Sequence, residues 1–142
     1  MIRIELLTWE QAQPITGPIR FASFVEEPEG TGFDLDDKDA QCVHAVAYDP
    51  SGKAVGTGRL LPEGQIGRLA VLKDWRRRGV GDAILAALTE EARKRGLTEV
   101  VLSAPLRAAE FYRDHGFTAE GKVYKEADVL HQAMRKSLLP GP

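Results

Sequence analysis

The segment Trp75–Leu85, WRRRGVGDAIL, decides how the rest of the chain is interpreted. Three arginines lead into Gly79 and Gly81, and an apolar pattern with helical spacing begins at Val80. A helix start has unpaired backbone N–H groups and a partial positive charge, and glycines let a ligand approach the backbone closely. Arginine donors beside such groups favour an anion, above all a phosphate. The alternative interpretation is a solvated, basic turn in front of a helix.

Two common nucleotide-binding motifs do not fit this segment. A dinucleotide fold uses G-x-G-x-x-G, but Ile84 occupies the position of the third glycine. The phosphate loop G-x-x-x-x-G-K-[ST] is absent from the chain. The phosphate-bearing ligand predicted here is therefore of another kind.

Working outward, the apolar spacing predicts a helix over residues 80–95 that ends at Gly96. Upstream, alternation and turn residues predict a strand at 2–6 and a three-stranded meander. Pro14, Gly17 and Pro18 are expected to interrupt the chain before a short helix at 19–25, followed by a loop over 26–41. The meander strands are 42–48, 53–61 and 65–72; downstream we expect strand 99–103, helix 106–115, and strands 117–125 and 128–135.

This order of elements predicts an α/β fold of the α+β type with a mixed, mostly antiparallel sheet. A helix that connects strand 65–72 to strand 99–103 favours a parallel arrangement of these two strands. The length of 142 residues suits one domain over 1–142, with a frayed tail from about residue 137 to 142.

Composition excludes several function classes. The 19 basic and 21 acidic side chains give a net charge of -2, so we expect no nucleic-acid partner. One cysteine, Cys42, excludes an internal disulfide framework. No apolar run suits a membrane helix and the N-terminal residues do not resemble a secretory signal, so we expect a cytoplasmic protein without membrane contact. The aspartates of segment 34–39 do not match a calcium loop; we expect a solvated acidic loop and no metal.

Three blocks in the correct order resemble the GNAT superfamily of acyl-CoA-dependent N-acyltransferases. Arg76-x-x-Gly79-x-Gly81 is similar to the family's acyl-CoA-binding motif, Gln/Arg-x-x-Gly-x-Gly/Ala. Ala108–Phe117, AAEFYRDHGF, resembles its A-x-x-F-Y-x-x-x-G-F block, and Val55–Leu60 resembles its central meander strand. The end of the chain, from Tyr124 to Met134, is similar to a small bacterial subgroup that ends in E-x-G-I-P-H-x-x-M.

The resemblance implies an acetyl-CoA co-substrate held where two parallel strands splay apart, with helices on both faces of the sheet. It implies that backbone amides at Arg77–Asp82 hold the pyrophosphate, and that the strand at Leu69–Val71 binds the pantetheine arm. It further implies an amine acceptor, from a small molecule or a protein, and is compatible with a homodimer, since members often dimerise. The implied cofactor-binding residues are Leu69, Ala70, Val71, Arg76, Arg77, Arg78, Gly79, Val80, Gly81, Asp82, Ala108 and Tyr112.

Tyr112 is the catalytic residue that the resemblance implies, as the general acid that protonates the departing thiolate. From spacing alone it would be a packed aromatic beside Phe111. The general base is open, because residues 65–68 hold no carboxylate. Glu27, His44 and His131 are candidates for the acceptor side, although both histidines also suit structural roles; His115 suits the end of a helix. The missing base leaves open an alternative function, a non-catalytic acyl-CoA-binding sensor.

Overall fold

The computed structural model describes residues 1–23, 37–126 and 128–139. The strands are β1 (Arg3–Leu7), β2 (Val43–Tyr48), β3 (Ala54–Leu60), β4 (Ile66–Val71), β5 (Glu99–Pro105), β6 (Thr118–Glu126) and β7 (Val129–Ser137). The helices are α1 (Trp9–Phe21), α2 (Val80–Lys94) and α3 (Ala109–Asp114), with short 3₁₀ turns η2 (Asp39–Gln41), η3 (Lys73–Trp75) and η4 (Leu106–Ala108).

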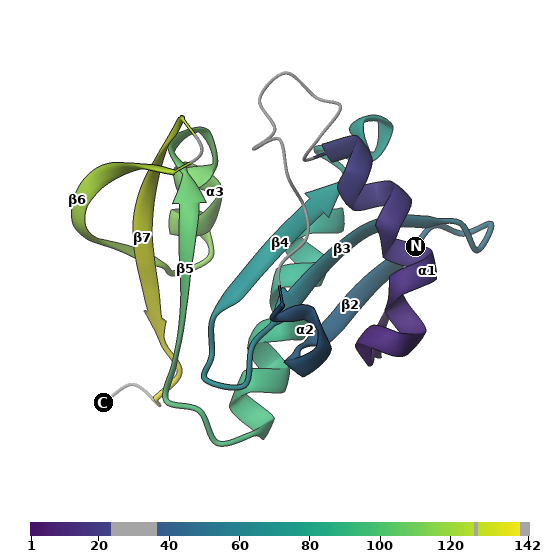
Figure 1. Cartoon of the computed structure of the whole chain (residues 1–142), viewed down its shortest axis with the longest axis horizontal. Coiled ribbons are helices and arrows are strands. Elements are labelled where there is room, and N and C mark those ends of the chain that lie inside the picture. The colour runs from purple at the N-terminus through teal and green to yellow at the C-terminus, as the bar shows by residue number, and fades with distance from the viewer. Residues whose placement is uncertain (24–36, 127, 140–142) are drawn as a thin grey trace.

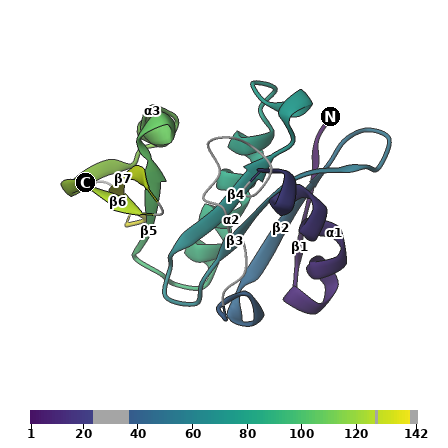
Figure 2. The ribbon, with the colours of Figure 1, turned by 45° about the horizontal axis from the view of Figure 1, so that its top comes forward.

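The strands form two antiparallel sheets, in the orders β1-β2-β3-β4 and β5-β7-β6. The sheets meet through β4 and β5, whose only bridge among the described residues is a parallel one between Gln65 and Val101. The Val101 N–H donates to the Gly64 carbonyl at the same place, 3.0 Å away. Beyond this point the two strands diverge, and β5, β7 and β6 stand beside the four-stranded sheet (Figures 1 and 2). The predicted mixed fold and its parallel strand pair are confirmed.

A β-bulge lies in β4 at the level where the strands separate. Arg59 pairs with Gly67 and Thr57 with Ala70, so two residues of β4 oppose Gly58 alone. Arg68 takes up the extra length with a positive φ of 50°. Because a bulge bends its strand and increases the local twist, it directs the second half of β4 away from β5.

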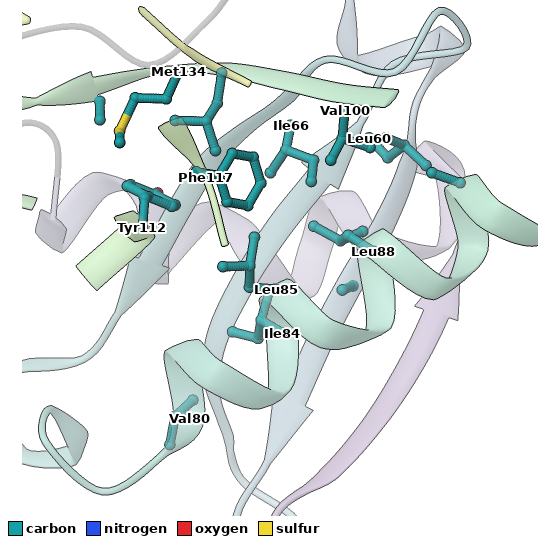
Figure 3. Packing of buried hydrophobic residues seen from close by; sticks show 14 of the residues in the cluster. Leu60, Ile66, Val80, Ile84, Leu85, Leu88, Val100, Tyr112, Phe117 and Met134 are labelled. Atoms are coloured by element: carbon teal, nitrogen blue, oxygen red, sulfur yellow. The ribbon is translucent and has the colours of Figure 1, made fainter. Parts of the chain in front are cut away.

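The apolar face of α2 packs on the sheets and joins them. Val80, Ile84, Leu85 and Leu88 are buried, and they project from one side of the helix toward the strands (Figure 3). The same cluster includes Leu102, Phe117 and Met134 of the second sheet and its neighbours. One hydrophobic core therefore holds both sheets in place under α2.

The helix α1 covers the opposite face of the first sheet (Figures 1 and 2) and differs from the prediction. It spans Trp9–Phe21 and contains both Pro14 and Pro18, instead of beginning after them. Thr8 caps its first turn in a capping box with Gln11, and packing of its buried face compensates for the two missing N–H donors. The part of the expected helix beyond residue 23 lies outside the described residues.

Asp39 corrects the prediction of a solvated acidic loop. Its carboxylate is only 3% exposed and binds Arg20 of α1 at 3.1 Å and Arg59 of β3 at 2.8 Å. Burial by itself would raise the pKa of Asp39, but the hydrogen bonds and charges of the two arginines lower it below its ordinary value. The segment therefore anchors α1 to the sheet through a buried ion cluster.

The C-terminal end also differs from the prediction of a frayed tail from about residue 137. Ser137 ends β7, and Leu138 is buried, with its N–H donating to the Thr98 carbonyl at 2.8 Å. Residues 140–142 lie outside the described part. Among the described residues, no helix combines the length and apolar character needed to cross a membrane.

Candidate active site

A pocket of about 690 Å³ opens between the end of β4, the start of α2 and the segment before α3. This volume is in the range of small-molecule sites. Its lining consists of Ser23, Leu69, Ala70, Val71, Arg76, Arg77, Gly79, Gly81, Asp82, Arg107, Ala108 and Phe111. The structure thus brings nine of the twelve predicted cofactor-binding residues together; Arg78, Val80 and Tyr112 are not in the lining.

The backbone at the start of α2 is arranged for an anion. Gly79 caps the helix with φ of 83° and no side-chain hydrogen bond, and Arg77 also has a positive φ of 62°. Ala83 donates to the Gly79 carbonyl, so the N–H groups of the preceding residues have no acceptor inside the helix. A Cβ placed on Gly79 would meet no atom within 4 Å, so the cap borders open space.

Gly81 is the point of close approach in this lining. A Cβ there would lie 3.3 Å from the Phe111 ring and 3.9 Å from the Val71 side chain. A long side chain at this position would have to leave through the pocket. The lack of a side chain at Gly81 therefore leaves space for a ligand between α2 and α3.

The arginines of the opening segment have different surroundings. Arg76 donates through Nε to the Val71 carbonyl at 3.0 Å, which ties the segment to the end of β4. Arg78 stacks its guanidinium over the Trp75 ring at 4.9 Å. Arg77 lines the pocket together with Arg107 of η4, on the other wall. The pocket therefore combines several cations with one lining carboxylate, Asp82.

Tyr112 lies behind the pocket in the hydrophobic core, and only 7% of it is exposed. Its ring packs edge-on against Phe111 at 5.1 Å and Phe117 at 5.8 Å, and Figure 3 shows it beside Phe117 and Met134. Burial raises the pKa of Tyr112 to about 12. The phenol therefore keeps its proton at neutral pH.

Comparisons with known proteins show the family to which this fold belongs. The profile of the family described as the acetyltransferase (GNAT) domain matches residues 20–138. The chain belongs to the GNAT acetyltransferase family. It is 34% identical over 107 residues to the Bacillus subtilis protein named uncharacterized N-acetyltransferase YjcF, covering 72% of this chain and 76% of that protein.

Solved GNAT structures share the fold. An acyl-CoA N-acyltransferase from Pseudomonas aeruginosa superposes with a TM-score of 0.83 at 26% identity, covering 96% of this chain and 99% of that one. A GNAT acetyltransferase from Elizabethkingia anophelis, solved with acetyl-CoA bound, has a TM-score of 0.73 at 14% identity, covering 96% and 98%. At that identity, the second comparison supports the fold alone.

His44, a candidate for the acceptor side, lies on the α1 face of the first sheet and is buried. Its Nε2 donates to the Asp39 carbonyl at 2.9 Å, and its ring packs on Trp9 at 4.9 Å. Burial lowers the pKa of His44, although the Asp39 backbone and charge act in the other direction. The structure places this histidine in the ion cluster of Asp39 and outside the pocket lining.

His131, the second candidate, lies on β7 opposite Pro105 of β5. Its Nδ1 donates to the Val129 carbonyl at 2.8 Å, and its Nε2 is 3.5 Å from Glu126. Tyr124 stacks on the ring at 6.0 Å and forms a hydrogen bond with Ser103 of β5. The third candidate, Glu27, lies outside the described residues.

Three lining residues were missed by sequence reasoning. Phe111 follows Ala108 by one helical turn, so helical spacing could have placed both on the same side. Arg107 precedes Ala108 in a 3₁₀ turn, whose geometry the helical prediction did not include. Ser23 enters from the end of α1, and its hydroxyl has no hydrogen-bond partner among the described residues; no sequence signal indicated it.

Proposed function

We propose that this GNAT protein transfers an acetyl group from acetyl-CoA to a primary amine of a small molecule or a protein. The pocket between β4, α2 and α3 is the observation behind this proposal. It brings together helix N–H groups that have no acceptor inside the helix, arginine side chains, and Gly81, which has no side chain. These are the features that a pyrophosphate needs. Acetyl-CoA is the co-substrate that we propose on this basis, and a GNAT acetyltransferase with the same fold was solved with acetyl-CoA bound. A cytoplasmic location and a homodimer, both expected from the sequence, remain predictions.

The cradle at Arg77–Asp82 would receive the pyrophosphate through backbone amides. Arg76, Arg77 and Arg78 would supply positive charge near it. Gly81 matters most, because Phe111 and Val71 leave little room above it. The bound ligand would then extend from the start of α2 along β4.

The second half of β4 would hold the pantetheine arm and the acyl carbonyl. Within the described residues its pairing with β5 is limited to the bridge at Gln65, and no described strand pairs with that edge beyond it. An amide in the segment Leu69–Val71 would stabilise the oxyanion of the tetrahedral intermediate, an effect worth about 3 kcal/mol where one such donor was removed elsewhere.

Tyr112 would act as the general acid on the departing thiolate. The reaction joins the amine nitrogen to the acyl carbon, and the C–S bond breaks with its electron pair leaving on sulfur. Because burial raises the pKa of Tyr112, the phenol holds its proton at neutral pH and is available as the donor when the thiolate departs. Its burial beside Phe111, which lines the pocket, supports this position.

The acceptor amine must lose a proton before it attacks. We assign the acceptor side to the β5–β7 region at His131, since Pro105, its partner across the strands, directly precedes the pocket segment Leu106–Ala108. His44 is less suitable, because it is buried in the Asp39 cluster and is not in the pocket lining. A base acting through water from Glu27 also remains part of the proposal.

The alternative is a non-catalytic acyl-CoA sensor, favoured by the lack of any carboxylate on β4. One assay distinguishes the acetyltransferase from the sensor. Acetyl-CoA is incubated with diamines, amino acids, amino sugars and lysine peptides, and both thiol release and acetamide products are measured. An N-acetyltransferase produces equal amounts of CoA and acetylated amine with at least one acceptor. Binding of acetyl-CoA without amine-dependent thiol release across the whole panel would favour the sensor.

A further inference from the structure

The carboxylate of Asp82 is an unexpected charge in a phosphate pocket. It lies in the first turn of α2, lines the pocket and is 57% exposed. An acidic side chain stabilises the N-terminus of a helix that has no anion bound there. When a phosphate occupies the same helix end, the two negative charges repel each other. A group that pairs with this carboxylate would therefore add to the effect of the lining arginines and favour phosphate binding.

His115, at the end of α3, is placed to offset it. Its Nε2 lies 3.2 Å from Asp82 Oδ1, and its Nδ1 is 2.8 Å from the Phe111 carbonyl oxygen. A carbonyl oxygen only accepts hydrogen bonds, so Nδ1 must carry a proton. A neutral ring would then direct the lone pair of Nε2 at a carboxylate. A protonated ring instead places a positive charge 3.2 Å from the carboxylate, the arrangement of an ion pair.

The other groups around His115 are few in the described part of the chain. On α3 the Phe111 ring packs on the imidazole at 4.6 Å. From β7, Lys136 approaches the adjacent Gly116, where a Cβ would lie 3.5 Å from its Nζ. From α2 the facing charge is Asp82. The carboxylate is therefore the charged partner that the ring meets directly.

We propose that His115 is a positioning residue for the acyl-CoA phosphate site, acting as an imidazolium that neutralises Asp82. The pair joins the first turn of α2 to α3, whose Phe111 forms the opposite wall at Gly81. Loss of the proton leaves Asp82 without its directly contacting partner beside the bound pyrophosphate. The inference rests on the proposed function, because it requires acyl-CoA in this pocket.

The test measures acetyl-CoA dissociation constants by calorimetry between about pH 5.5 and pH 8, where histidine charge changes. We expect wild-type affinity to fall about fivefold with rising pH, the effect of one partly exposed charge pair. His115→Gln binds about fivefold more weakly than wild type at low pH and loses this part of the pH dependence. The measurements are repeated with 3′-dephospho-CoA, which lacks the 3′-phosphate, so that titration of this phosphate does not contribute to the pH dependence.

The decisive comparison is the double variant. Asp82→Asn removes the charge that needs neutralising, so Asp82→Asn combined with His115→Gln should regain most of the lost affinity. Arg113→Gln removes an exposed cation from the same helix and should bind like wild type. A double variant as weak as His115→Gln would overturn the inference, since that pattern indicates a packing role only. Absence of acetyl-CoA binding by wild type at every pH would instead overturn the proposed function itself.

Discussion

Tyr112 shows how burial and chemistry combine at one residue. The ring belongs to the hydrophobic core and packs on two phenylalanines, as expected of a structural aromatic. The same burial raises the pKa of Tyr112 to about 12, so the phenol is protonated at neutral pH and can donate its proton to a thiolate that forms beside it. A structural residue and a general acid are therefore compatible here.

We predict that Tyr112→Phe lowers kcat by about 10²-fold, the lower end of the range for general acids. Acetyl-CoA affinity should stay within about twofold, because the phenol is outside the pocket lining. The measurement is steady-state turnover with any acceptor found in the panel, beside calorimetry. Equal kcat values for the two proteins would remove the acid role. The acid is protonated at neutral pH, so the loss should not vary between about pH 6 and pH 9.

The amount of the site that sequence could predict depends on how local each residue's role is. Gly79, Gly81 and the arginines act through a short segment, so their pattern alone places them at one pocket. Asp39 is different, because its partners Arg20 and Arg59 come from separate elements. Its acidic neighbours made it resemble a solvated residue, and only the fold brings the two arginines to it.

At the scale of elements, the Asp39 cluster holds α1 against β3. Two arginines share one buried carboxylate, so removing that carboxylate leaves buried positive charge without its partner. Breaking a buried ion pair on one side costs about 3–5 kcal/mol in other proteins. The cluster also explains how α1 remains attached despite its two prolines.

We predict that Asp39→Asn lowers the free energy of unfolding by about 3 kcal/mol at pH 7. The folded-state pKa of Asp39 is below its ordinary value of 3.8, so its contribution is complete above that pH. The contribution disappears as the pH falls through the lowered value. Urea unfolding at pH 7 and near pH 3 should show a smaller difference at acid pH. Asp37→Asn, an exposed neighbour, is the control, and an equal effect there would refute the cluster's role.

The contact between β3 and α2 depends on glycine. A Cβ on Gly58 would lie 2.9 Å from Ile84 Cγ2 and 3.1 Å from Leu88 Cδ1. Such distances require α2 or its side chains to move. The meander strand therefore allows the helix to approach closely, which also fixes the start of α2 at the pocket.

We predict that Gly58→Ala destabilises the protein by about 1–3 kcal/mol through overpacking. Gly17→Ala is the matched control, because nothing lies within 4 Å of its Cβ and alanine favours a helix. Chemical denaturation of both variants gives the comparison. The account of close packing is wrong if Gly58→Ala is as stable as wild type while Gly17→Ala behaves as expected.

Elements were easier to predict from sequence than their ends. The helix at Val80 and the meander strands follow clear periodicity and turn residues, and in the structure their ends differ from the prediction by at most one residue. The predicted start of α1 was wrong, because tertiary packing on the sheet outweighs the local cost of the two N–H donors that its prolines lack. The bulge at Arg68 left no sequence signal, although it directs the second half of β4 away from β5.

At the scale of the whole molecule, two sheets share one core and separate at the pocket. The bridge at Gln65 and the packing under α2 hold them at one end. A ligand that contacts β4, α2 and η4 together would join both halves, so its binding should stabilise the whole fold. We propose that this ligand is an acyl-CoA.

The measurement that tests this claim most directly is a thermal unfolding series with acetyl-CoA, NAD and ATP. A ligand at about a hundred times its dissociation constant adds about 2.7 kcal/mol. We predict that acetyl-CoA raises the Tm of wild type and of the control Gly17→Glu by several degrees, more than NAD or ATP. Gly81→Glu, whose side chain would occupy the pocket, should show no shift. No stabilisation of wild type by acetyl-CoA, or an equal shift in Gly81→Glu, would contradict the account.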